Sequence, residues 1–324
     1  MTVDAQILSA LRAAPSGVSG ADLSRQLKMT RAGVWAHIEE LRALGYDIEA
    51  SPHLGYRLLG SPDALHADDL SARLGKVRVV GREIHVFQET TSTNDVAARL
   101  ARGGAEEGAV VFAESQTKGR GRMGRAWVSP AGKGLWFTVL LRPDCPPQGT
   151  TQLTVAAATA LARAVTLQTG IVPEIKWPND ILIRGRKIAG ILTEMRAEVD
   201  RVQEVLLGIG MDVNLEAADF ADGLRRTATS LKLETGQKVN RAELAVAVLR
   251  ELDRDYQAVA EGHFDRLAEQ WAERCSTLGC QVAIRIGDRV VRGRAESLDN
   301  DGALLVRGLH GHLERIVGGD VTQD

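Results

Sequence analysis

The hydrophobic pattern at the start of the chain predicts a small helical module. Apolar positions recur at helical spacing in residues 5–13 and again in residues 31–44. Between them, the residues that follow Ser19 match the start of a further short helix. Thr30 stands at the N-cap position of the third helix, and Gly45 stands where the residue that ends it is expected.

A hairpin is expected after these helices. Residues 46–59 read as two short strands around a turn, and Gly60 begins a linker. Three helices followed by a hairpin predict a winged helix-turn-helix DNA-binding domain over residues 1–61. A protein-interaction or dimerisation module is the alternative. The DNA interpretation assigns contacts to the turn and to the third helix, at Lys28, Thr30, Arg31, Trp35 and His37.

The middle of the chain mixes strand-like and helical segments. We expect two strand segments in Val77–Phe87 and a further apolar strand in Val202–Val213. Leu153–Gln168 is rich in alanine and apolar on nearly all sides, which predicts a buried helix. From Thr277 onward, apolar and polar residues alternate in short segments separated by glycine-containing turns, which predicts a small all-β barrel.

Composition and charge narrow the class of protein. The 324 residues suffice for two or three domains, and a net charge of −2 gives no global attraction to nucleic acid or membrane. The three cysteines are too few and too far from other ligands to suggest a disulfide framework or a metal site. The sequence shows neither an apolar run of transmembrane length nor a signal-peptide pattern, so we expect a cytoplasmic protein without a membrane partner.

The most distinctive stretch is Glu114–Trp136, which we call the glycine-arginine loop. Three glycines alternate with three arginines between two strand-like segments. Glycine lets backbone N–H groups approach an anion, and guanidinium groups add charged, planar donors. A phosphate site is one interpretation, and a basic surface loop that touches nucleic acid is the other. The arginines are Arg120, Arg122 and Arg125.

Other polar groups suit the same chemistry. Ser92, Thr93 and Asn94 are good N-cap residues for the helix that follows, and they also offer hydrogen bonds to a polar ligand head. Two amines and a carboxylate lie around tight turns, as phosphoryl or nucleotidyl chemistry requires, although a surface hairpin with solvated charges is the plainer interpretation. They are Lys176, Asp180 and Lys187.

Four motifs in this order resemble those of the biotin protein ligases: STN, GRGRMGRAW, KWPNDI and RKIAGILTE. With the N-terminal module, the resemblance covers essentially the whole chain and is to the bifunctional type, which also represses the biotin operon. It implies an α+β protein with three domains. These are the winged helix-turn-helix, a catalytic α/β domain with a mixed sheet over residues 62–275, and an SH3-like β-barrel over residues 276–324.

The resemblance also implies the ligand sets. It assigns biotin to Ser92, Thr93, Asn94, Gln116, Arg120, Gly121, Arg122 and Lys187. It assigns ATP to Arg120, Arg122, Arg125, Trp127, Lys176, Asn179 and Asp212. Catalytic roles fall to Lys187, Arg122, Lys176 and Asp180, and Mg²⁺ to the carboxylates of Asp180 and Asp212.

The implied reaction makes biotinyl-5′-AMP from biotin and ATP, and then transfers biotin to a lysine of the biotin carboxyl carrier protein. The implied regulation is repression at operator DNA by a homodimer that forms when the adenylate is bound. Two alternatives are a ligase whose N-terminal module no longer represses, and a ligand-sensing transcription factor without catalysis. The lysines at 176 and 187 speak against the second alternative.

Two positions depart from the family pattern. Asp212 stands where the resemblance leads us to expect asparagine, which adds a negative charge near the phosphates. The turn of the expected wing reads His53-Leu54-Gly55-Tyr56, where a lysine is usual, so one positive phosphate contact is lost.

Overall fold

The computed structural model describes residues 1–323, which cluster into two compact units. The N-terminal unit comprises Met1–Lys76 together with Asn240–Val246, and the rest of the described chain forms the second unit. No helix in the described part of the chain combines the length and the apolar character needed to cross a bilayer.

The N-terminal unit contains the expected helices and hairpin. Thr2, Ser19 and Thr30 each cap a helix by accepting a backbone N–H with the side-chain oxygen, and Gly45 has a φ of 94° after the third helix. The prediction of a helix-turn-helix with a wing-like hairpin is therefore confirmed. Its elements are α1 (Val3–Ala13), α2 (Gly20–Leu27), α3 (Arg31–Ala43), β1 (Asp47–Ser51), β2 (Gly55–Gly60) and α4 (Ala67–Leu74).

Helix α4 belongs with this unit because it packs on α1. The buried carboxylate of Asp69 on α4 accepts a hydrogen bond of 2.5 Å from Arg12 of α1 and one of 2.8 Å from Arg73. A buried carboxylate needs such partners, so the two arginines fix α4 to the helical core. The domain boundaries at residues 61 and 275 remain predictions.

The second unit is built on a seven-stranded sheet in the order β3-β4-β5-β9-β8-β7-β6. Strands β3 and β4 are parallel and the other pairs are antiparallel, so the predicted mixed sheet is confirmed. The strands are β3 (Glu83–Thr90), β4 (Ala109–Gln116), β5 (Gly134–Leu141), β6 (Glu174–Lys176), β7 (Asp180–Ile183), β8 (Arg186–Ala197) and β9 (Val202–Asp212).

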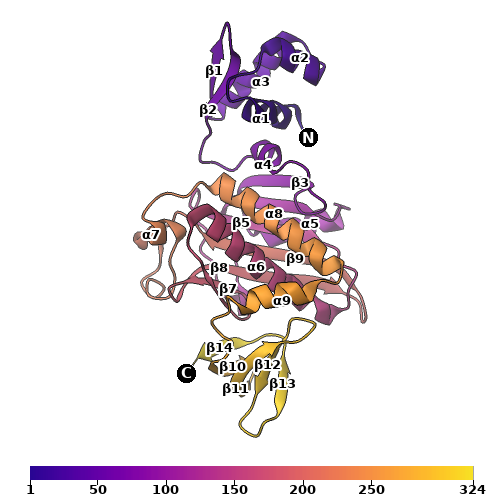
Figure 1. The fold of residues 1–324 in the computed structure, drawn as a ribbon, viewed down its shortest axis with the longest axis vertical. Coiled ribbons are helices and arrows are strands. Elements are labelled where there is room, and N and C mark those ends of the chain that lie inside the picture. Colours follow the sequence, from indigo (N-terminus) through magenta and orange to yellow (C-terminus); the bar gives the residue numbers. More distant parts are fainter. Residues whose placement is uncertain (324) are drawn as a thin grey trace. The chain divides into compact units, whose positions relative to one another are not determined.

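Helices cover this sheet (Figure 1). The predicted buried helix is α6, and Arg163 on it binds Glu251 of α8 and Gln270 of α9, each at 2.7 Å. These polar contacts join three helices, and Arg163 also binds Asp255 of α8. The helices are α5 (Thr93–Arg102), α6 (Thr150–Thr169), α7 (Leu231–Thr235), α8 (Arg241–Ala260) and α9 (Phe264–Ala272).

One expectation about this unit is wrong. Val77–Phe87 does not form two strands, because only β3, from Glu83 onward, is a strand. The backbone N–H groups of Val79 and Val80 instead donate to the carboxylate of Asp253 on α8, at 2.7 and 2.9 Å. A helix side chain has taken the donors that a sheet ladder would have used.

The C-terminal part of this unit is an antiparallel sheet of five strands in the order β13-β12-β11-β10-β14. It confirms the predicted small β domain. Alternating residues of β11 are buried, as expected for a sheet with one face on a core. The strands are β10 (Gln281–Ile286), β11 (Arg289–Leu298), β12 (Leu304–Arg307), β13 (Leu313–Ile316) and β14 (Asp320–Gln323).

Candidate functional site

The site begins where the two parallel strands end. Thr90 of β3 lies opposite Gln116 of β4 in the parallel ladder, so the segments that follow both strands emerge at one edge of the sheet. Gln116 joins them, because its Oε1 accepts from the backbone N–H of Thr93 at 2.9 Å and from the Thr93 hydroxyl at 3.2 Å. Its amide Nε2 donates to Ser129 at 2.9 Å. The structure therefore brings together the start of α5 and the glycine-arginine loop.

Asn94 is buried in this corner. Its Oδ1 lies 2.5 Å from the hydroxyl of Thr138 on β5, and its Nδ2 donates to Glu194 of β8 at 2.9 Å. A Cβ atom at Gly208 of β9 would come within 2.4 Å of the same Oδ1. The glycine provides the space in which the asparagine side chain lies, and both ends of the amide are bound by the protein.

The glycine-arginine loop closes on itself through backbone hydrogen bonds. The N–H of Gly121 donates to the carbonyl of Arg125 at 2.7 Å, and the N–H of Trp127 donates to the carbonyl of Gly119 at 2.9 Å. A Cβ at Gly119 would lie 2.5 Å from the Trp127 carbonyl, so this closure requires glycine there. Gly124, at the tip, has a φ of 72°.

Arg120 does not point toward an open anion site. Its Nε and Nη2 donate to the two oxygens of Glu194, each at 2.9 Å, and its Nη1 donates to Asp95 at 2.8 Å. The hydrogen bonds to Glu194 raise the pKa of the guanidinium above its ordinary value, and burial opposes them only partly. Two carboxylates thus neutralise the residue for which a phosphate contact was expected.

The other two loop arginines contact the C-terminal sheet. Arg122 Nη1 lies 3.3 Å from both Asn179 Oδ1 and the carbonyl of Gly319, and Arg125 forms an ion pair with Asp320 of β14. Burial lowers the pKa of Arg122, and the negative charge of Asp320 opposes that change. The loop tip therefore joins the KWPND turn to the start of the last strand.

The indole of Trp127 packs against the sheet at two glycines. Gly190 of β8 and Gly210 of β9 are opposite each other in the ladder. A Cβ at Gly210 would come within 2.6 Å of the indole and one at Gly190 within 3.1 Å. The ammonium of Lys187 lies 5.1 Å from the centre of the Trp127 ring and 2.6 Å from Asp180 Oδ1. The structure thus brings together Trp127, Lys187 and Asp180.

Asp212 is buried at the end of β9, with 6% of its surface exposed. Burial raises its pKa well above the ordinary value, because the charged form loses water, and the nearby charge of Lys187 offsets part of this. Lys176 lies opposite Asp180 in the β6–β7 ladder. Lys187 thus forms an ion pair with Asp180 and acts electrostatically on Asp212, and Lys176 is the ladder partner of Asp180.

Sequence reasoning missed three residues here. Glu194 and Asp95 bind Arg120, and Thr138 meets Thr93 at 2.8 Å between the hydroxyl oxygens. Glu194 is the only carboxylate in the β8 sequence and follows the apolar run 188–192, which was the available signal for it.

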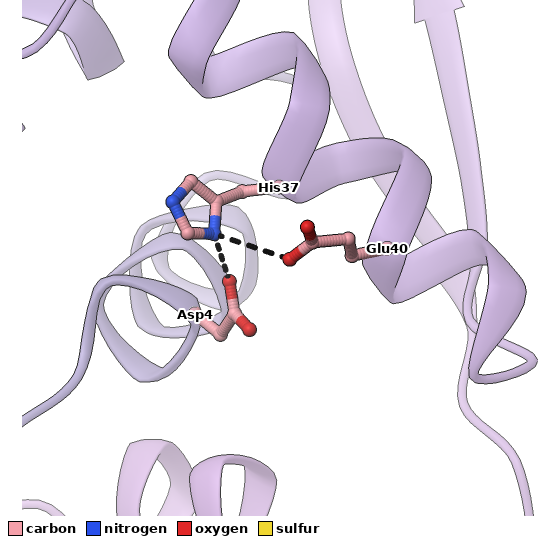
Figure 2. A group of neighbouring side chains, drawn as sticks. All are labelled: Asp4, His37 and Glu40. Atoms are coloured by element: carbon pink, nitrogen blue, oxygen red, sulfur yellow. Dashed lines mark hydrogen bonds and ion pairs between the residues drawn. The ribbon is translucent and has the colours of Figure 1, made fainter.

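The candidate DNA-binding residues of the N-terminal unit separate into two groups. Lys28, Thr30, Arg31 and Trp35 are exposed, and the Trp35 side chain keeps 56% of its surface open to solvent. His37 lies apart from them, because its Nδ1 is 2.7 Å from Asp4 Oδ1 of α1 and 3.7 Å from Glu40 Oε2. Figure 2 shows the imidazole turned toward these two carboxylates. His37 therefore connects α3 to α1.

Comparison with known proteins agrees with this organisation. The profile of the Biotin/lipoate A/B protein ligase family matches residues 86–212, an HTH domain profile matches residues 4–57, and the Biotin protein ligase C terminal domain profile matches residues 277–322. Fold and site thus define a protein in which a helix-turn-helix module is joined to an α/β ligase domain.

Two curated relatives match 94% and 69% of this chain. The chain is 40% identical to the bifunctional ligase/repressor BirA of Bacillus subtilis over 304 residues, which are 94% of this chain and 93% of that protein. It is 39% identical over 233 residues to the biotin–[acetyl-CoA-carboxylase] ligase of Paracoccus denitrificans, covering 69% of this chain and 93% of that one. The chain belongs to the biotin protein ligase family.

Solved structures support the same assignment. The biotin protein ligase of Aquifex aeolicus in complex with biotin and ATP superimposes with a TM-score of 0.64 at 26% identity. The match covers 75% of this chain and 99% of that protein.

Proposed function

We propose that this protein is an ATP-dependent biotin protein ligase that also represses transcription. In the first step an oxygen of the biotin carboxylate bonds to the α-phosphorus of ATP, the bond to the β-phosphate oxygen breaks, and pyrophosphate leaves. In the second step a lysine amine of the biotin carboxyl carrier protein attacks the carbonyl carbon of biotinyl-5′-AMP, and AMP leaves with the former carboxylate oxygen. Both steps need one site that holds the polar ring of biotin and places its carboxyl group beside the α-phosphate.

The observation that carries this proposal is the junction between the STN segment and the glycine-arginine loop. Gln116 binds Thr93 on one side and Ser129 on the other, so it holds the STN segment next to the glycine-arginine loop. Polar groups on the α5 side provide the donors and acceptors that a ureido ring requires. The biotin residues under this proposal are Ser92, Thr93, Asn94, Gln116, Arg120, Gly121, Arg122 and Lys187.

The phosphate side is supplied by cations around Asn179 and Trp127. Attack of one anion on another requires neutralisation of charge, which Arg122, Arg125, Lys176 and Lys187 provide. Lys187 lies on the indole of Trp127 and is placed by it. Asn179 is held by its Nδ2, which donates to the carbonyl of Ile191 at 2.7 Å.

The residues present fit Mg²⁺ in the way that nucleotide sites usually hold it, by one or two carboxylates together with phosphate oxygens. Asp212 is a buried carboxylate with a raised pKa, which a cation would relieve, and Asp180 lies beside Lys187. In the described part of the chain, the one group of three mutually close metal-ligating side chains is Asp4, His37 and Glu40, in the other unit. When bound through Asp180 and Asp212, Mg²⁺ would neutralise the triphosphate.

The ligase proposal is tested by incubating the protein with ATP, Mg²⁺, radiolabelled biotin and an acceptor domain that carries the target lysine. We expect label in the acceptor only when all components are present. ATP–pyrophosphate exchange that depends on biotin reports the first step by itself. Absence of both signals in a folded protein would remove the ligase proposal.

The repressor proposal rests on the exposed residues of the helix-turn-helix. Lys28 and Arg31 flank the start of α3 and are exposed, so their charges can bind DNA phosphates. His37, in contrast, is bound to Asp4. We propose that the adenylate-bound protein forms a homodimer that binds an inverted-repeat operator. Because it must reach operator DNA, we propose that the protein acts in the cytoplasm. A gel shift with and without biotinyl-5′-AMP tests this. A ligase active on its acceptor but unable to shift DNA would leave only the ligase-only alternative.

A further inference from the structure

Glu194 occupies a position between the two halves of the proposed biotin site. It lies on β8 opposite Leu206 of β9, with 37% of its side chain exposed. One oxygen accepts from Arg120 Nε, and the other accepts from both Arg120 Nη2 and Asn94 Nδ2, all at 2.9 Å. A single carboxylate thus binds the loop and the start of α5.

The contact with Arg120 is geometrically specific. Two parallel N–H donors meet two oxygens, which is the strongest arrangement that a guanidinium and a carboxylate adopt. The remaining nitrogen Nη1 is bound by Asp95, so Glu194 and Asp95 together engage the whole guanidinium. An arginine held in this way fixes the backbone of the loop and has little charge left for a phosphate.

Glu194 also orients Asn94 at the start of α5, which is the other half of the proposed biotin site. Thr138 binds the Oδ1 of Asn94, and Gly208 leaves the space for it, so Glu194 completes the set of partners that orients this amide. The backbone of the neighbouring Thr93 is in turn bound by Gln116. Loss of Glu194 would leave Arg120 with Asp95 and Asn94 with Thr138, so both side chains would lose the partner that they share while the sheet stays paired.

We propose that Glu194 is a positioning residue of the biotin site, which acts through Arg120 and Asn94 and does not itself touch the ligand. This inference rests on the proposed ligase function. It predicts that Glu194 sets how firmly the glycine-arginine loop docks before and during biotin binding. It also predicts a loss of biotin affinity that exceeds any loss of catalytic rate at saturating biotin.

The test compares wild type with Glu194→Gln by titration calorimetry of biotin binding without ATP. Glutamine keeps the shape but loses one acceptor oxygen and the charge, so we expect biotin to bind about tenfold more weakly, as when a buried polar group loses a partner. We also expect faster tryptic cleavage at the loop arginines of the ligand-free protein. The matched control is Glu204→Gln on β9, which removes a carboxylate bound to Arg196 and leaves the loop contacts intact.

A double-mutant cycle with Arg120→Gln separates positioning from general destabilisation. If Glu194 acts through Arg120, the double variant binds biotin about as well as the weaker single variant. Fully additive losses, or biotin affinity within twofold of wild type in folded Glu194→Gln, would overturn the inference. Should Glu194→Gln fail to fold, Glu194→Asp keeps the charge but shortens the reach, and the same two outcomes apply to it.

The proposed function fails separately from this inference. Wild-type protein without biotin-dependent pyrophosphate exchange would remove both. An active wild type together with an unaffected Glu194 variant would remove the inference alone.

Discussion

The guanidinium of Arg125, at the tip of the glycine-arginine loop, forms an ion pair with the carboxylate of Asp320 at the start of strand β14. The two residues are 195 positions apart in the chain. The arginine side chain keeps 66% of its surface exposed, so the pair contributes roughly 0–1 kcal/mol to stability. The ion pair matters because Asp320 competes with ATP for Arg125, which is one of the cations that we propose bind the triphosphate.

We therefore predict that Asp320→Asn tightens ATP binding. Removal of the competing carboxylate leaves Arg125 to the phosphates, and a gain of roughly two- to fivefold corresponds to one exposed ion pair. Titration calorimetry with ATP measures it. Asp301→Asn, which breaks an ion pair with Arg315 in the same sheet, is the control and should leave ATP affinity as it is. Weaker ATP binding by Asp320→Asn would show that Asp320 supports the loop instead of competing with it.

Lys187→Ala and Arg122→Ala should each lose adenylate formation by about a hundredfold or more, because each removes a cation from a site where negative charge is concentrated. Biotin-dependent ATP–pyrophosphate exchange measures the loss, and circular dichroism checks that the fold survives. Arg184→Ala is the control, since that arginine is exposed and pairs with Glu234 outside the site. Exchange at the wild-type rate in either site variant would contradict the assigned roles.

Asp212→Asn should stabilise the protein, and increasingly so as the pH rises. The raised folded-state pKa means that Asp212 costs nothing at low pH, where it is protonated both folded and unfolded. Above the ordinary carboxyl pKa of about 4 the unfolded state ionises more readily, so wild-type stability falls until the pH exceeds the raised value. Each pKa unit of difference between the folded and the unfolded state changes the free energy of unfolding by about 1.4 kcal/mol.

Urea unfolding of both proteins across this pH range is the measurement. Asp219→Asn is the comparison variant, and its effect on stability should have the opposite sign. Burial tends to raise the pKa of Asp219, but its hydrogen bonds with Lys133 lower it overall, so that substitution should destabilise above the ordinary carboxyl pKa. A pH-independent difference between Asp212→Asn and wild type would show that Asp212 is not a strained carboxylate.

Within the N-terminal unit, Arg31→Ala should weaken operator binding and reduce the slope of log affinity against log salt by about 1, the value for one phosphate contact. His37→Ala should leave that slope unchanged, because the imidazole of His37 is turned toward Asp4 and Glu40 (Figure 2). It should instead lower the stability of the unit by about 1 kcal/mol. Filter binding at several salt concentrations distinguishes the two, and equal slopes for Arg31→Ala and wild type would remove Arg31 from the interface.

Local signals in the sequence predicted local structure well. Thr30 caps α3 and Gly45 follows it with positive φ, as their chemistry requires. The glycine and arginine pattern also located the loop between two strands. Such signals depend on neighbours within a few residues, which is why they survive without knowledge of the fold.

The contacts that the sequence did not reveal involve partners that are distant in the chain. Nothing near Arg120 reveals that Glu194, 74 positions later, will bind it, and nothing near His37 reveals Asp4. The β-like run around Val79 was misread because Asp253 of a remote helix binds its backbone. A side chain's charge was readable from the sequence, but the group that compensates it depended on tertiary structure.

Where strands β8 and β9 pass beneath Trp127, each contributes a hydrogen atom in place of a side chain, at Gly190 and Gly210. The indole N–H of Trp127 is buried there without a hydrogen-bond partner. The indole thus packs directly on main chain, and its N–H is a donor that an acceptor atom of a ligand would satisfy. A methyl group on either glycine would crowd the ring, so the place of Trp127 above the sheet depends on two residues that have no side chain.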